Sequence, residues 1–164
     1  MKYKDLIARM KSVRNYKREA LNEDVIKKLK DYSGKSKRLV NDIEIEATIK
    51  NRDEVYDKLK NIAGYNDTML DAPHYLILLS EEKEHYIENT GYAVEDIRLK
   101  ANELGVSSCW ITLNDGELIK EKLNIKSDKK LTALISLGFD DSKNKVLYEN
   151  KSEYNPSKAV VNIV

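Results

Sequence analysis

Apolar residues recur three or four positions apart in five stretches of the chain. This spacing places them on one face of a helix, where they can pack against a core. The pattern predicts helices over residues 3–11, 23–33, 53–63 and 83–104, and a short helix after Asp115–Gly116. The predicted buried face of the first helix comprises Tyr3, Leu6, Ile7 and Met10. That of the longest comprises Ile87, Gly91, Val94, Ile97, Ala101 and Leu104. Asn22 is the predicted N-cap of the second.

Four other stretches have the pattern of β-strands. From Ile43 to Ile49 apolar and polar residues alternate, which predicts a half-buried strand, antiparallel or at a sheet edge. The apolar runs at 74–79, 106–113 and 130–138 predict further strands, and the first of them is typical of a central position. The order of elements favours a mixed sheet with helices on both faces, in one domain over residues 1–164. The apolar end, Ala159–Val164, needs a partner, either this chain's own sheet edge or that of another subunit.

The junction from Leu99 to Ile111 contains the only tryptophan and the only cysteine of the chain. A helix stops there at Gly105 and passes directly into a strand. In most proteins such a junction is scaffold, and in a few families it is the floor of a flat cofactor's pocket. The segment alone leaves both interpretations open.

Charge and composition exclude several classes of function. Lys plus Arg number 29 and Asp plus Glu number 28, so the net charge is +1 and no basic stripe favours nucleic acid. No stretch approaches the roughly 18 apolar residues of a membrane span, and the N-terminus lacks the apolar run of a signal peptide. A single cysteine excludes an internal disulfide. We therefore expect a cytoplasmic protein without nucleic-acid or membrane partners.

Candidate chemistry is concentrated at the end of the first helix. Arg9, Lys11, Ser12 and Arg14 supply cations and a hydroxyl that match the oxygens of a phosphate. The alternative is an ordinary basic C-terminal turn, which the helix dipole favours. Elsewhere no nucleophile elbow or metal-ligand spacing is present, so no catalytic side chain and no metal site are predicted.

Three segments together resemble the FMN-dependent nitroreductase family over nearly the whole chain. The first is Asp5-Leu-Ile followed by Ser12-Val-Arg-x-Tyr16, similar to that family's opening helix and basic segment. The second runs from Asn89 to Ile111 and includes Leu104-Gly-Val-Ser-Ser-Cys-Trp110, which resembles the family's long helix and strand entry. The third is Leu134-Ile-Ser-Leu-Gly-Phe139, similar to a late strand of the family.

The resemblance implies an α+β homodimer with a mixed, mainly antiparallel central sheet and an FMN at each of two interface sites. It implies that the opening segment holds the phosphate and ribityl chain, and that the backbone after the Cys-Trp strand faces flavin N5. A late basic residue, Lys158 or Lys151, would close on the phosphate. The cofactor-binding residues implied are Arg9, Lys11, Ser12, Arg14, Ile111, Thr112, Leu113 and Lys158.

The activity implied is transfer of a hydride from NADH or NADPH through flavin N5 to a small electron acceptor, such as a nitroaromatic or a quinone. The flavin carries this chemistry, so no dedicated acid or base is required. Met10 stands where the family usually has its first Arg, and the family's Asn-x-Gln-Pro-Trp segment is not recognisable. These departures leave two alternatives: an FMN-binding sensor or storage protein without useful turnover, and a structural dimer that has lost FMN.

Overall fold

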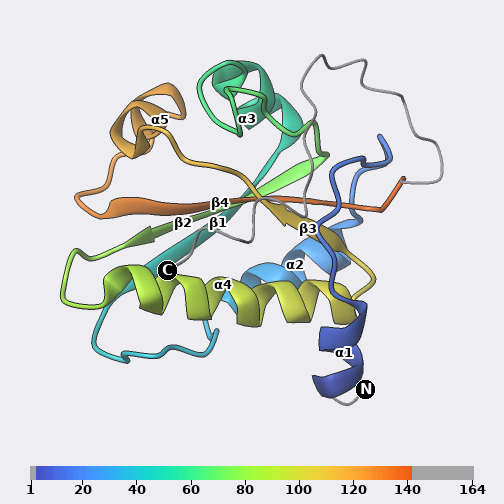
Figure 1. The fold of residues 1–164 in the computed structure, drawn as a ribbon, viewed down its shortest axis with the longest axis horizontal. Coiled ribbons are helices and arrows are strands. Elements are labelled where there is room, and N and C mark those ends of the chain that lie inside the picture. The colour runs from blue at the N-terminus through green and yellow to red at the C-terminus, as the bar shows by residue number, and fades with distance from the viewer. Residues whose placement is uncertain (1–2, 142–164) are drawn as a thin grey trace.

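The computed structural model describes residues 3–141, which form five helices and four strands (Figure 1). The helices are α1 (Tyr3–Arg9), α2 (Glu23–Ser33), α3 (Arg52–Leu59), α4 (Tyr86–Glu103) and α5 (Gly116–Lys122). The strands are β1 (Ile45–Asn51), β2 (His74–Ser80), β3 (Ser107–Trp110) and β4 (Lys130–Gly138). The C-terminal run Ala159–Val164 and the candidate phosphate ligands Lys151 and Lys158 lie outside the described residues.

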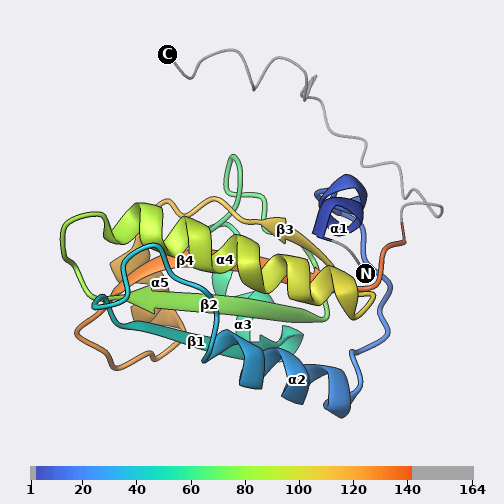
Figure 2. The same cartoon turned by 90° about the horizontal axis from the view of Figure 1, so that it is seen from below.

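The four strands form one sheet in the order β1-β2-β4-β3, and every neighbouring pair is antiparallel. Within residues 3–141 the only parallel pairing is an isolated bridge between Ser12 and Ser108. Helices α3 and α5 cover one face of the sheet, and α2 and α4 cover the other (Figure 2). Helix α1 packs against α4. This arrangement confirms the predicted α+β class, with helices on both faces of a mainly antiparallel sheet.

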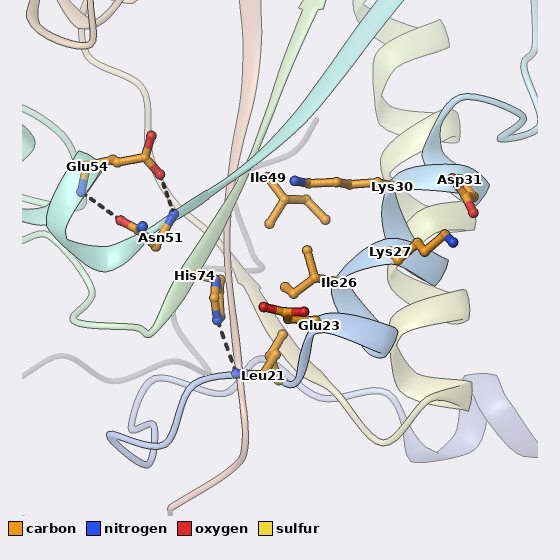
Figure 3. Close-up of a pocket in the computed structure, with 10 residues that line it drawn as sticks. All are labelled: Leu21, Glu23, Ile26, Lys27, Lys30, Asp31, Ile49, Asn51, Glu54 and His74. Carbon is orange, nitrogen blue, oxygen red and sulfur yellow. Dashed lines mark hydrogen bonds between the residues drawn. The ribbon is translucent and has the colours of Figure 1, made fainter.

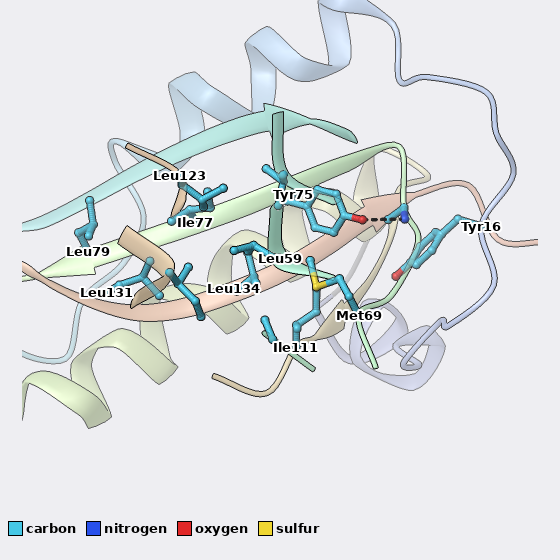
Figure 4. Packing of buried hydrophobic residues seen from close by; sticks show 14 of the residues in the cluster. Tyr16, Leu59, Met69, Tyr75, Ile77, Leu79, Ile111, Leu123, Leu131 and Leu134 are labelled. Atoms are coloured by element: carbon cyan, nitrogen blue, oxygen red, sulfur yellow. Dashed lines mark hydrogen bonds between the residues drawn. The ribbon is translucent and has the colours of Figure 1, made fainter. Parts of the chain in front are cut away.

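Strand β2 has apolar residues at successive positions because both of its faces are covered. Tyr75, Ile77 and Leu79 point toward α3 and α5 (Figure 4), whereas Leu76 and Leu78 point toward α2 and α4. All five are buried. Each buried Leu or Ile contributes on the order of 2 kcal/mol to folding. The central position predicted for this strand is confirmed.

Strand β1 is an edge strand, as its alternating pattern predicts. Ile49 is buried against the α2 and α4 layer, together with the half-buried Ile45. Just before the strand, Arg38 bends back onto it and donates to the carbonyls of Ile43 (2.9 Å) and Ile45 (3.4 Å). An open strand edge is a template for unwanted pairing, and the Arg38 guanidinium occupies part of this one.

Some residues of α1 and α4 that were predicted to lie in the core are exposed. In α1 only Leu6 is buried, while Tyr3 and Ile7 are 50% and 59% exposed, because α4 is the one helix that this helix packs against extensively among the described residues. In α4 the predicted Val94, Ile97 and Ala101 are buried, whereas Ile87 is 55% exposed.

Ile87 is exposed although the first turns of α4 lie over the sheet. Thr90, one turn after Ile87, is buried, and its hydroxyl donates to that of Thr132 in β4 (3.1 Å). Ile87 lies two helical turns before Glu95, which accepts the indole N–H of Trp110, the last residue of β3. A Cβ added at Gly91, one turn before Glu95, would meet no atom within 4 Å. The described residues therefore leave this flank of α4 uncovered.

Asp96 of α4 joins three other parts of the chain. Its carboxylate is nearly buried and accepts hydrogen bonds from the Lys37 backbone N–H (2.9 Å), the Tyr32 hydroxyl (3.0 Å) and the Tyr3 hydroxyl (3.3 Å). A buried carboxylate needs such partners, because an unpaired charge in the interior is strongly destabilising. These bonds fix α1, α2 and the connection after α2 against α4.

Candidate functional site

Residues 11–17, which we call the basic segment, cross the sheet where β3 begins and β4 ends. The backbone N–H of Val13 donates to the carbonyl of Ser108 (3.2 Å), and that of Lys17 donates to the carbonyl of Phe139 (2.9 Å). The bridge between Ser12 and Ser108 adds the start of β3 to this contact. The segment is therefore held by the backbones of two strands.

Two side chains of the basic segment are buried and hold it in place. Val13 and Tyr16 both belong to the core on the α3 and α5 side. The Tyr16 hydroxyl lies 2.8 Å from that of Ser136, and burial raises the pKa of Tyr16 well above its ordinary value. Ser136 in turn donates to the Cys109 carbonyl (3.1 Å), which ties the anchor to β3.

The glycine of the Leu-Gly-Phe motif has a steric role in this contact. A Cβ on Gly138 would lie 2.7 Å from the Pro73 ring and 2.8 Å from the Tyr16 ring. Both distances are shorter than real Cβ contacts, so only glycine allows Tyr16 to lie this close to β4.

The positions between these anchors face outward. Lys11, Ser12 and Arg14 are exposed, and an Arg14 Nη1 donates to the Ser12 carbonyl at 3.5 Å. Lys11 forms an ion pair with Asp140, and Arg9 is the last residue of α1. Two cations and a hydroxyl on a fixed backbone form a donor set that fits a phosphate. The sequence-predicted Lys11, Ser12 and Arg14 thus lie on one exposed stretch beside the start of β3, and Arg9 precedes them at the end of α1.

The other predicted cofactor residues, Ile111, Thr112 and Leu113, lie at the opposite end of β3. Ile111 is buried, and its N–H donates to the carbonyl of Leu134 (2.9 Å). Thr112 is exposed and Leu113 half-buried. Within residues 3–141 the backbone N–H groups of these two residues have no hydrogen-bond partner, so both can donate to a bound group. Since Ser108 precedes Ile111 by three residues, about 10 Å separates the two parts of the site.

The loop from Asn61 to Leu70 also borders the Thr112 end, which the sequence did not indicate. The Gly64 N–H donates to the Thr112 carbonyl (2.8 Å), and Asn114 donates to the Asp67 carboxylate (2.7 Å). This loop exposes Tyr65. The available signal was its content of Asn, Asp and Gly, since Asn61, Gly64, Asn66 and Asp67 all have positive φ.

A separate cavity of about 510 Å³ lies between α2, the end of β1 and the start of β2 (Figure 3). Ile26 and Lys30 of α2 line it on one side, and Ile49 and His74 line it on the other. Of the sequence-predicted cofactor residues that lie within 3–141, none lines this cavity. Among the residues that the structure describes, no group of three or more His, Cys, Asp or Glu is placed to hold a metal ion. No helix in the same part of the chain is both long and apolar enough to span a membrane.

Residues 2–163 match the family described as Putative TM nitroreductase. No curated protein matches the chain. Similar solved structures include a nitroreductase family protein from Clostridium novyi NT, with 24% identity over 88% of this chain and 90% of that one, at a TM-score of 0.72. Another is a Putative NADH Oxidase from Clostridium acetobutylicum, with 26% identity over 98% and 100% of the two chains and a TM-score of 0.68. A nitroreductase with bound FMN from Bacteroides fragilis NCTC 9343 is 20% identical over 100% of this chain and 99% of that one, with a TM-score of 0.69.

Replacing His74 should change how stability depends on pH. Its Nε2 accepts the Leu21 N–H (3.1 Å), and burial, with a smaller effect of Lys30, lowers the pKa of His74. The unfolded chain therefore binds more protons once the pH falls below about 6.5, and the free energy of unfolding declines until the folded-state pKa is passed. In His74→Gln, which keeps an acceptor, urea denaturation from pH 7.5 to 5 should show a smaller decline. Equal slopes in both proteins would contradict this assignment.

Gly64→Ala should destabilise the protein. Gly64 has φ +103°, and an added Cβ would lie 2.1 Å from the Thr68 carbonyl oxygen. Such strain costs about 1–3 kcal/mol, measured as the change in the free energy of unfolding in urea. The matched control is Gly34→Ala, at φ −67° with no atom closer than 3.9 Å, which should stabilise the protein by about 0.4–1 kcal/mol. The prediction fails if the two substitutions have the same effect.

Proposed function

The chain belongs to the Putative TM nitroreductase family, and from this we propose that it is an FMN-dependent oxidoreductase. It takes a hydride from NADH or NADPH and passes it through flavin N5 to a small electrophile, such as a nitroaromatic or a quinone. The observation that carries the proposal is the pair of donor groups at the two ends of β3. One end has exposed cations on a fixed backbone, and the other has unpaired backbone N–H groups.

Each end of β3 suits a different part of FMN. Lys11, Ser12 and Arg14 would bind the phosphate by charge and by hydrogen bonds to its oxygens. The N–H groups of Thr112 and Leu113 would donate to the ring edge near N5. When bound, the flavin supplies the hydride chemistry, so these residues bind and orient it and do not act as acid or base.

Two of the similar structures support this proposal, one for the cofactor and one for the electron donor. The nitroreductase from Bacteroides fragilis contains bound FMN, and the protein from Clostridium acetobutylicum is named for NADH. The family's description as a nitroreductase supports the nitroaromatic acceptor.

A second candidate is an FMN-binding protein without useful turnover. The observation in its favour is the ion pair between Lys11 and Asp140. It places a carboxylate beside the proposed phosphate site, where negative charge opposes binding of an anion. A yellow protein that neither NADH nor NADPH bleaches would support this candidate over the enzyme.

Purified protein mixed with FMN should retain the yellow flavin absorbance, and addition of NADH or NADPH under anaerobic conditions should bleach it. Arg14→Ala should weaken FMN binding by about 1.5–3 kcal/mol, the value of a charged hydrogen bond, in a fluorescence titration. Lys28→Ala, which removes an exposed cation of α2, is the control and should bind FMN as the unaltered chain does. Protein that stays colourless with FMN would refute the proposal.

We also propose that the protein is a homodimer formed through the outer side of α4. Exposed apolar side chains lie on this helix and on two elements that contact it, α1 and β3: Tyr3, Ile7, Ile87, Tyr92 and Trp110. Several large apolar groups on one surface are typical of an interface. Gly91 on the same helix leaves room for close approach of a second helix.

Sedimentation velocity at micromolar concentration should give twice the 18.9 kDa mass of one chain. Ile7→Glu should shift the protein to the monomer, because it would bury a carboxylate in the interface. Lys58→Glu introduces the same side chain on α3, across the sheet, and should leave the dimer intact. A monomeric unaltered chain, or equal effects of both substitutions, would rule out this interface.

A further inference from the structure

Arg98 of α4 is a buried cation whose partners connect the outer surface to the candidate site. It is 7% exposed, and its Nε donates to the Ser108 hydroxyl (2.9 Å). Its Nη1 donates to Glu95 (2.6 Å), and the same carboxylate oxygen accepts from the Trp110 indole (2.7 Å). Arg98 therefore holds two alternate residues of β3, the buried Ser108 directly and the partly exposed Trp110 through Glu95.

Ser108 is also the residue of β3 that receives the basic segment. Its carbonyl accepts the Val13 N–H, and its backbone forms the bridge with Ser12. A continuous chain of contacts thus runs from the Arg98 guanidinium, through the hydroxyl and backbone of Ser108, to the backbone of Ser12 and Val13. The exposed Lys11 and Arg14 flank these two residues in the sequence.

The chemistry of this chain of contacts requires arginine. A planar guanidinium can bond Ser108 and Glu95 at the same time with fixed geometry, whereas a lysine ammonium is a single point on a flexible stem. The cation is also buried on the α4 side of Ser108, where solvent screens it less than it screens the exposed Lys11 or Arg14. Because its charge is paired with Glu95, the contribution of Arg98 to the site is to fix the backbone of β3 and of the basic segment.

We propose that Arg98 is a positioning residue for the anionic end of the cofactor. Acting through Ser108, it fixes the basic segment and so sets the preference of the site for a flavin that carries a phosphate over one that lacks it. This inference rests on the proposed function, because it concerns how the same site recognises FMN.

The test compares the dissociation constants of FMN and riboflavin, two flavins with the same ring that differ in the phosphate. Both are measured by fluorescence titration for the unaltered chain, Arg98→Met, Arg98→Lys and Ser108→Ala. In the Met and Ala variants the preference for FMN should fall by roughly 10-fold or more, as expected for loss of a charged hydrogen bond. The riboflavin constant should stay within about twofold, and Arg98→Lys should be intermediate. Lys100→Met, on the same helix, is the control and should keep the full preference.

The outcomes separate this role from a general structural one. If Arg98→Met does not fold, Ser108→Ala decides the question, since it removes the contact and leaves the arginine in place. An unchanged preference, or equal weakening of both flavins, would overturn the role of Arg98 while leaving FMN binding established. Failure of the unaltered chain to bind either flavin would instead overturn the proposed function, and this inference with it.

Discussion

The close contact between Tyr16 and Gly138 is the constraint on which the candidate site depends. Because Gly138 has no side chain, the Tyr16 ring can lie against the end of β4, and its hydroxyl can reach Ser136. This contact fixes the direction in which the basic segment crosses the sheet. Lys11 and Arg14 face outward because Val13 and Tyr16 face inward. The orientation of exposed cations is thus set by packing on the opposite side of the same backbone.

Helix α4 performs a second organising role through its polar residues. Asp96 binds groups from α1, α2 and the loop after α2, while Arg98 binds Ser108 of β3. Apolar packing alone would tolerate small rotations of these elements about α4. Buried polar groups tolerate them less, because each lost hydrogen bond leaves a desolvated donor or acceptor. The start of the basic segment, which follows α1, and its contact with Ser108 of β3 therefore both depend on the same helix.

The sequence predicted the strands best where burial is on both faces, as in β2 and β4, because a short continuous apolar run is typical of a strand covered on both sides. It predicted the Asn22 cap correctly, since that bond is local. It was wrong about Ile87 and Ile7, because helical spacing shows that a helix has an apolar face but not what covers it. The contacts that hold the site residues in place could not be predicted from the sequence. The contacts of Gly64 with Thr112 and of Arg98 with Ser108 join segments whose proximity follows only from the complete fold.

The position of Trp110 gives the protein an internal optical reporter. It is the only tryptophan in the chain, so all indole emission comes from one place. That indole is partly exposed on the outer side of α4 and hydrogen-bonded to Glu95, and its strand has one part of the site at each end. The intensity and wavelength of this emission therefore depend on hydration of that surface and on chromophores bound nearby. One spectrum, without labelling, can follow events at either end of β3.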